Sequence, residues 1–153
     1  MLSSFGGVQA LDRSRQVIAL TGDGGFNMLM GEFMTAVQHK LPVKVIVYNN
    51  SALGLITLEA ESVGLAPFRE AIEFPNPDFA ALARACGGHG FTARQPSELK
   101  AAISEAFAVD GPAIVDAVVI ANEMPNMPHV ELEQVEHFAV AKIKEAVLAV
   151  TGW

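Results

Sequence analysis

Two short apolar runs, each followed by small or polar residues, constrain the fold of this chain more than any other feature. The first run covers residues 16–20 and the second covers residues 43–48. Their nearly unbroken apolar character is typical of strands buried on both faces of a parallel sheet. A helix is predicted between them, from about Asn27 to His39, and it would join the two strands as a parallel pair. We expect Asn27 to cap this helix.

The residues that follow the two runs would meet at one edge of the sheet, because parallel strands share their carboxyl ends, where open α/β sheets bind ligands. Asp23 follows the first run and Asn50 follows the second. Carboxylate and amide oxygens are the hard ligands that Mg2+ prefers. Gly22, Gly24 and Gly25 predict a tight turn whose backbone N–H groups can approach a phosphate. The pattern predicts a magnesium–diphosphate site, and a plain strand–helix–strand unit with two turns is the alternative.

The rest of the chain continues to alternate helices and strands, which predicts an α/β fold: a three-layer parallel sheet with helices on both faces. A helix capped by Ser97 is expected to precede a third long strand, and Asp116 in that strand is interpreted as a strand-end or edge carboxylate. The other predicted elements are a short helix at 51–59, a loop at 61–76, a helix from Asp78 to Cys86, a strand at 90–93, the strand at 113–119, a connector at 123–129 and a C-terminal helix at 130–150.

Composition narrows the class of protein. With 153 residues, 51% hydrophobic and 18% charged, the chain is expected to form one compact domain over 1–153. The net charge is −7, and the four basic residues nearest the proposed site form no stripe, which argues against a nucleic-acid partner; they are Arg13, Arg15, Lys40 and Lys44. A single cysteine, Cys86, excludes an internal disulfide and fits the cytoplasm, and we interpret it as a small buried hydrophobe. No run approaches the roughly 18 apolar residues of a transmembrane helix.

The combination of residues 22–24, Gly-Asp-Gly, with Asn49 and Asn50 resembles the thiamine diphosphate motif of the decarboxylase and oxidase superfamily. Residues 25 to 48, 24 in all, separate its two halves, as they do in that motif. The resemblance to this superfamily extends to Glu32, Ala36 and residues 41–43 and 50–54. Four further runs are similar to pyruvate oxidase and pyruvate dehydrogenase (quinone): residues 74–80, 85–87, 110–116 and 131–134. The resemblance covers nearly the whole chain from about Ala10 onward.

The resemblance implies that the chain is the C-terminal domain that binds thiamine diphosphate. By that resemblance, Mg2+ would be held by Asp23, Asn50 and the backbone carbonyl of Ala52. Glu59 matches a carboxylate near the reactive ring of the cofactor and is expected to be catalytic, with a solvated surface glutamate as the alternative. The residues implied to contact the cofactor are Gly22, Asp23, Gly24, Gly25, Asn50, Ala52, Leu53 and Gly54.

The implied activity is oxidative decarboxylation of pyruvate or a similar 2-keto acid. The pyrimidine-binding domain of the family and its central domain, which binds FAD in the oxidases, would lie upstream. We therefore expect an N-terminally truncated domain, with residues 1–12 as the remnant of an upstream segment, that is incomplete without a pyrimidine-binding domain or subunit. A homo-oligomer is also expected. The alternatives are a domain of an acetolactate synthase or another 2-keto acid decarboxylase, and a non-catalytic α/β assembly module.

Overall fold

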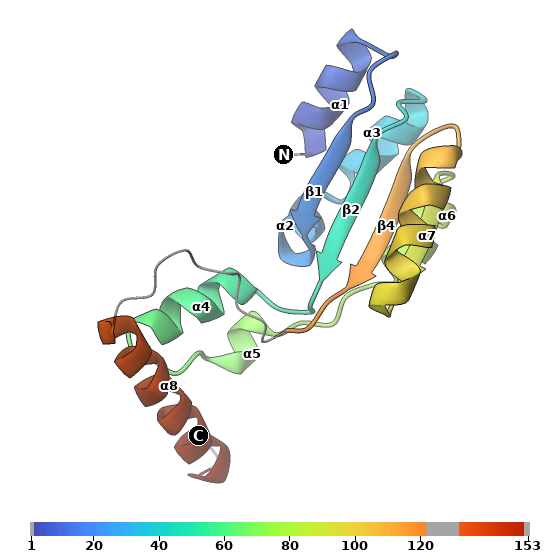
Figure 1. Cartoon of the computed structure of the whole chain (residues 1–153). Helices are drawn as coiled ribbons and strands as arrows, with labels where there is room; N and C mark the ends of the chain where they lie inside the picture. Colours follow the sequence, from blue (N-terminus) through green and yellow to red (C-terminus); the bar gives the residue numbers. More distant parts are fainter. Residues whose placement is uncertain (1, 122–131, 152–153) are drawn as a thin grey trace. The chain divides into compact units, whose positions relative to one another are not determined.

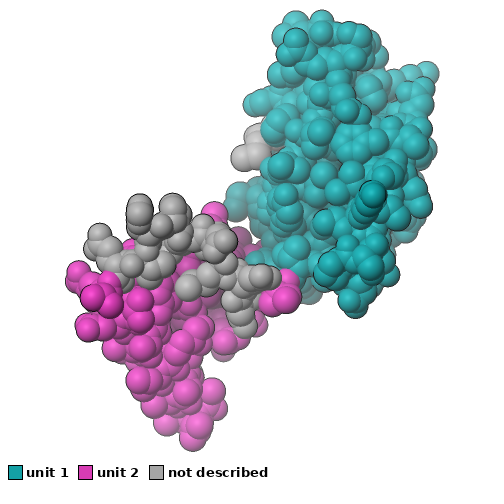
Figure 2. Space-filling view, in the orientation of Figure 1, with its two compact units in different colours: residues 1–51, 75–119 teal, residues 52–74, 120–153 magenta. Residues whose placement is uncertain are grey.

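The computed structural model describes residues 2–121 and 132–151, which belong to two compact units (Figure 2). Unit 1 comprises residues 1–51 and 75–119, and unit 2 comprises residues 52–74 and 120–153. The predicted connector at 123–129 lies outside the described residues. The single domain expected over the whole chain stays a prediction.

Unit 1 is built on a four-stranded parallel sheet with the strand order β1-β2-β4-β3. Figure 1 shows β1, β2 and β4 side by side. The strands are β1 (Ile18–Gly22), β2 (Lys44–Asn49), β3 (His89–Ala93) and β4 (Ala113–Val118). The predicted parallel α/β architecture is confirmed, and each strand lies within about two residues of its predicted position. In this order β4 is an inner strand, with β2 on one side and β3 on the other.

Helices cover both faces of the sheet, as predicted. The helices of unit 1 are α1 (Leu2–Leu11), α2 (Asp23–Leu29), α3 (Glu32–Gln38), α6 (Phe79–Ala85) and α7 (Pro96–Ala108). On one face, Phe33 of α3 and Phe79 of α6 pack with Val45 in the larger core. On the other face, Ala106 of α7 packs with Val115 in a smaller core. None of the described helices has the length and apolar character that a membrane span requires.

The predicted helix from Asn27 to His39 is wrong in two respects. It is two helices, because backbone bonds from Phe33 to Met30 (3.1 Å) and from Met34 to Gly31 (3.0 Å) form a turn between α2 and α3. It also begins earlier, with Gly22 at the N-cap position and Asp23 as the first helical residue. Asn27 therefore lies inside α2 and does not cap it.

The glycines after β1 form no separate turn. Gly24 and Gly25 lie in the first turn of α2, and their backbone is helical. Strand β1 thus passes directly into a helix. The sequence pattern missed this because glycine permits a turn as readily as it permits the start of a helix.

The expectation that the first strand is buried on both faces is also wrong. Ala19 is 2% exposed, whereas its neighbours Ile18 and Leu20 are 39% and 52% exposed. Side chains alternate between the faces of a strand, and the smaller core beneath α7 contains no residue of β1. Within unit 1, β1 is an edge strand that pairs only with β2.

The N-terminal ends of α6 and α7 differ in how well the sequence predicted them. The helix predicted from Asp78 is α6, and Asp78 is its cap, accepting a 2.7 Å hydrogen bond from the backbone N–H of Ala81. Helix α7 begins at Pro96, so Ser97 is not its cap. Gln95 takes the cap position, and its N–H donates to Oε2 of Glu98 at 3.1 Å. Proline at the first helical position is favoured because its ring already has a helical φ.

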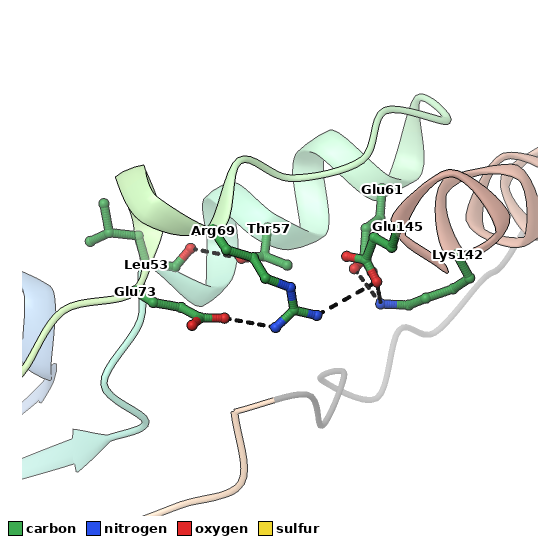
Figure 3. A network of polar contacts seen from close by, with 7 residues as sticks. All are labelled: Leu53, Thr57, Glu61, Arg69, Glu73, Lys142 and Glu145. Atoms are coloured by element: carbon green, nitrogen blue, oxygen red, sulfur yellow. Dashed lines mark hydrogen bonds and ion pairs between the residues drawn. The ribbon is translucent and has the colours of Figure 1, made fainter. Parts of the chain in front are cut away.

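Unit 2 consists of α4 (Gly54–Ser62), α5 (Arg69–Ile72) and α8 (Leu132–Thr151), joined by charged side chains (Figure 3). Nζ of Lys142 lies 2.6 Å from Glu61 and 3.1 Å from Glu145. Arg69 extends the network to Glu145 at 3.8 Å and to Glu73 at 2.8 Å. The side chain of Glu61 is only 8% exposed, so Lys142 neutralises a carboxylate that would otherwise be costly to bury.

Two predicted elements of unit 2 differ from the structure. The loop predicted at 61–76 contains α5, and the helix predicted at 51–59 begins at Gly54.

Gly90 marks the closest approach between the sheet and a helix, which generates a prediction. A Cβ at this position would lie 2.0 Å from the carbonyl oxygen of Ala80 in α6. Because backbone cannot yield as a flexible side chain can, Gly90→Ala should lower the free energy of unfolding by about 3 kcal/mol or more. Gly7→Ala is the control, since nothing lies within 4 Å of its added Cβ. Urea unfolding of both variants measures the difference, and equal stability would contradict this packing.

Candidate functional site

Six polar residues gather at the carboxyl edge of the sheet in unit 1, and we call them the carboxyl-edge cluster. They come from α2, from the end of β2 and the residues just after it, from the interior of β4 and from the segment before α6. The members are Asp23, Asn27, Asn49, Ser51, Asn76 and Asp116. Parallel pairing brings these segments together, because all four strands point their carboxyl ends the same way.

Asp23 is the centre of the cluster and is only 2% exposed. Its Oδ1 accepts a hydrogen bond from the N–H of Gly24 at 2.8 Å. Its Oδ2 accepts two bonds of 2.6 Å, one from the N–H of Ser51 and one from the side-chain amide of Asn76. Hydrogen bonds to an ionised acceptor are short and strong, so three donors offset much of the cost of burying this carboxylate.

Ser51 reaches Asp23 through an unusual backbone conformation. It follows Asn49 and Asn50 directly, and its φ of +56° lies in the left-handed region that residues other than glycine seldom adopt. This conformation is compatible with the 2.6 Å bond from its N–H to Asp23. Such backbone strain concentrates at functional sites, where the surrounding contacts maintain it.

Two amide side chains link Asp23 to a second buried carboxylate. The amide nitrogen of Asn49 donates to Oδ1 of Asp116 at 2.9 Å. The amide nitrogen of Asn76 donates to the amide oxygen of Asn49 at 2.8 Å, in addition to its bond with Asp23. The oxygen of Asn76 accepts from the amide of Asn27 at 2.7 Å. The result is a continuous path of hydrogen bonds between two carboxylates.

The interpretation of Asp116 as a strand-end or edge carboxylate is wrong. The sheet order places β4 between β2 and β3, where Asp116 pairs in register with Val47 and Thr92 and is 4% exposed. Burial raises the pKa of Asp116, and the negative charges of Asp78 and Asp23 add to this increase; the hydrogen bond from Asn49 offsets part of it. Local pattern could not reveal this, because strand order is a tertiary property.

The predicted site residues fall into two groups. Asp23 lies at the centre of the cluster, and the glycines and Asn50 adjoin it in the chain: Gly22 ends β1, Gly24 and Gly25 begin α2, and half-buried Asn50 precedes Ser51. The second group belongs to unit 2. There Ala52 forms an isolated bridge with Glu73, Leu53 and Gly54 stand at the start of α4, and Glu59 is exposed on that helix. The ligand and catalytic roles of these residues stay predictions.

Sequence reasoning placed Asn49 in the motif at this edge without giving its side chain a role, and it did not assign Ser51, Asn76 or Asp116 to the site. One signal was present for Asn76, which stands between Pro75 and Pro77. Proline fixes its own φ and restricts the residue before it, so this polar side chain is held on a stiff segment. A polar residue on such a segment, just before a capped helix, is a candidate for a positioned group.

The oxygen atoms of the cluster suit a hard cation such as Mg2+, because carboxylate and amide oxygens are the ligands that this ion prefers. Among the described hydrogen bonds, Oδ1 of Asp23 accepts a single one, and a carboxylate oxygen has two lone pairs. Residues 2–121 and 132–151 contain no group of three or more His, Cys, Asp or Glu side chains arranged to hold a metal ion. A site formed by the described residues would therefore use fewer than three such side chains and complete its coordination with neutral oxygen ligands.

Comparison with known proteins identifies the family. Residues 2–117 match the family described as thiamine pyrophosphate enzyme, C-terminal TPP binding domain. The chain belongs to this family. The matched residues include all of unit 1 from Leu2 through most of β4, and so the entire carboxyl-edge cluster.

The chain is similar to part of several curated relatives. The chain is 38% identical over 130 residues to YdaP of Bacillus subtilis (strain 168), whose name describes it as thiamine pyrophosphate-containing; the match covers 85% of this chain and 22% of that protein. It is 32% identical over 124 residues to the mitochondrial acetolactate synthase catalytic subunit of Saccharomyces cerevisiae, covering 81% and 18%. This chain thus spans about a fifth of the length of these relatives.

A solved structure agrees with the fold. The crystal structure of benzoylformate decarboxylase from Polynucleobacter necessarius superposes with a TM-score of 0.70 at 27% identity. The match covers 81% of this chain and 23% of that one. The parallel sheet with helices on both faces is therefore shared with part of this benzoylformate decarboxylase.

The raised pKa of Asp116 generates a prediction about pH. Between the ordinary value of 3.8 and the raised pKa, the folded state holds a proton that the unfolded state has lost. The free energy of unfolding should therefore fall as pH rises through that window. Asp116→Asn cannot titrate, yet its amide oxygen can still accept from Asn49. We expect this variant to gain stability relative to wild type as pH rises.

Urea unfolding of both proteins from about pH 3.5 to 7.5 measures this difference. The difference should grow across the window and become constant above the raised pKa. A stability difference that does not vary with pH, or that changes in the opposite direction, would contradict the assignment of a raised pKa to Asp116.

Proposed function

We propose that this chain binds thiamine diphosphate through a Mg2+ ion held at the carboxyl-edge cluster. The observation that carries the proposal is the buried carboxylate of Asp23, oriented by three donors and placed at the junction of β1 with a glycine-containing helix start. A family whose domain is described as TPP-binding supports the identity of the cofactor.

In this proposal Asp23, the side chain of Asn50 and the backbone carbonyl of Ala52 hold the Mg2+ ion. The backbone at Gly22, Gly24 and Gly25 has little side-chain bulk, which allows phosphate oxygens to come close. Leu53 and Gly54 would complete the cofactor contacts. The bound cofactor supplies an electron sink for decarboxylating a 2-keto acid, and the protein supplies binding and orientation.

We further propose that the whole enzyme acts on a 2-keto acid such as pyruvate. The local runs resemble pyruvate oxidase and pyruvate dehydrogenase (quinone), whereas the relatives found include acetolactate synthase and a 2-hydroxyacyl-CoA lyase of Arabidopsis thaliana, 34% identical over 110 residues. An acetolactate synthase-like activity is therefore equally well supported. The whole enzyme would also require a pyrimidine-binding domain and assembly into a homo-oligomer. If it is an oxidase, it would require an FAD-binding domain as well.

Removing the charge of Asp23 tests the proposed cofactor site. Wild type should bind thiamine diphosphate in the presence of Mg2+ and lose that binding when a chelator is added, as measured by isothermal titration calorimetry. Asp23→Asn should weaken Mg2+-dependent binding by at least about a hundredfold, because a direct ligand matters more than the outer-shell partners that typically contribute ten- to a hundredfold.

Asp12→Asn is the matched control for this measurement. Asp12 is an exposed aspartate that hydrogen-bonds Ser14, and an asparagine can keep those bonds. The control should bind the cofactor as wild type does. Equal affinities for wild type and Asp23→Asn would contradict the proposed site.

The proposed catalytic role of Glu59 makes a separate prediction. Glu59 is exposed on α4 in unit 2, so Glu59→Gln should leave the Mg2+-dependent calorimetric titration unchanged. In the enzyme completed with its pyrimidine-binding domain, the same variant should lower kcat for decarboxylation by about a hundredfold. Turnover equal to that of wild type would favour the alternative, a solvated surface glutamate.

A further inference from the structure

The carboxyl-edge cluster has a property that the proposed ligand set does not use: its two central amides each have a defined direction. Asn49 turns its nitrogen toward Asp116, so its oxygen faces the amide nitrogen of Asn76. Asn76 turns its nitrogen toward both Asn49 and Asp23. A carboxylate only accepts hydrogen bonds when ionised, so each carboxylate selects the nitrogen end of the amide beside it.

The bonds to Asp23 are divided unequally between its two oxygens. Oδ2 accepts from Asn76 and from the N–H of Ser51, both at 2.6 Å, and these two donors account for both of its lone pairs. Oδ1 accepts one described bond, from the N–H of Gly24 at 2.8 Å. The oxygen with capacity for a cation is therefore Oδ1.

We infer that Asn76 is a positioning residue for the cation site: its side-chain amide holds Oδ2 of Asp23 and so reserves Oδ1 for the metal ion. Asp116, acting through Asn49, fixes the direction of that amide. This inference rests on the proposed function, since it concerns the same cation at Asp23.

Asn76 is suited to this role by its place in the chain. It stands between Pro75 and Pro77, whose rings restrict the backbone on both sides. The next residue, Asp78, caps α6 and ties the segment to a helix of the larger core. The amide therefore reaches Asp23 from a stiff support, which lowers the entropy lost in holding it there.

A reversed amide at either position would be unfavourable. If Asn49 turned over, its nitrogen would face the nitrogen of Asn76, and its oxygen would face the carboxylate of Asp116. If Asn76 turned over, its oxygen would face the carboxylate of Asp23, and its nitrogen would face the amide nitrogen of Asn27, which now donates to it. The two carboxylates and Asn27 thus select a single arrangement of the cluster.

The test is the affinity of the 153-residue chain for Mn2+, a paramagnetic substitute for Mg2+, in the presence of thiamine diphosphate. Free Mn2+ is counted by electron paramagnetic resonance during titration. Asn76→Leu, close to asparagine in size but without donors, should weaken Mn2+ binding about ten- to a hundredfold, as is typical when a partner of a metal ligand is lost. Gln38→Leu is the matched control, because Gln38 is an exposed amide on α3 outside the carboxyl-edge cluster, and it should change the affinity by less than about threefold.

Asp116 variants separate positioning from general damage to the fold. Asp116→Leu should weaken Mn2+ binding about three- to tenfold, whereas Asp116→Asn should restore most of the affinity because its oxygen can still accept from Asn49. The double variant Asn76→Leu with Asp116→Leu should bind Mn2+ as Asn76→Leu alone does, because Asp116 acts only through Asn76. Independent losses of packing would instead add.

The outcomes distinguish this inference from the function on which it rests. Suppose that wild type binds Mn2+, that Asp23→Asn does not, and that the affinity of Asn76→Leu is within about twofold of wild type. This result would overturn the positioning role of Asn76 and leave the proposed cofactor site intact. Additive effects in the double variant, or a Gln38→Leu loss as large as that of Asn76→Leu, would also overturn it. Absence of Mn2+ binding by wild type would overturn both.

Discussion

The hydrogen bonding of one buried carboxylate governs the site. Asp23 is 2% exposed, and an ionised carboxylate without donors at such a depth would be very costly. Its three donors come from Gly24 in α2, from Ser51 after β2 and from Asn76 before α6. These segments converge because parallel pairing aligns the carboxyl ends of the strands, so the site requires the sheet and its larger core to be in place first.

The same sheet buries a second carboxylate, that of Asp116, and burying it is unfavourable for the stability of the fold. Asp116 occupies an inner strand where an apolar residue would pack well, and its raised pKa reflects the cost of charging it there. Its hydrogen bond to Asn49 connects it to the amides beside Asp23. Polar groups that weaken a core but complete a hydrogen-bond path are typical of functional sites. Asp116 is thus part of the hydrogen-bond path of the carboxyl-edge cluster.

Much of the local structure could be predicted. Strands β2, β3 and β4, and helix α6 with its Asp78 cap, follow from apolar patterning and capping residues. The errors involve neighbours: the exposed face of β1, the division of one helix into α2 and α3, and the inner position of Asp116. The burial of a strand and the interior of a sheet depend on strand order, which local patterning does not encode.

By itself, the sequence determined the elements and the two halves of the motif, and with them Asp23 and the carboxyl edge, because these depend on residues close together in the chain. The tertiary structure decided which polar side chains meet there. Asn76 bonds Asp23 across 53 positions of the chain, and Asn49 bonds Asp116 across 67. Such bonds form only when strand order, register and the path of a connecting segment are all fixed, and a local pattern carries none of the three.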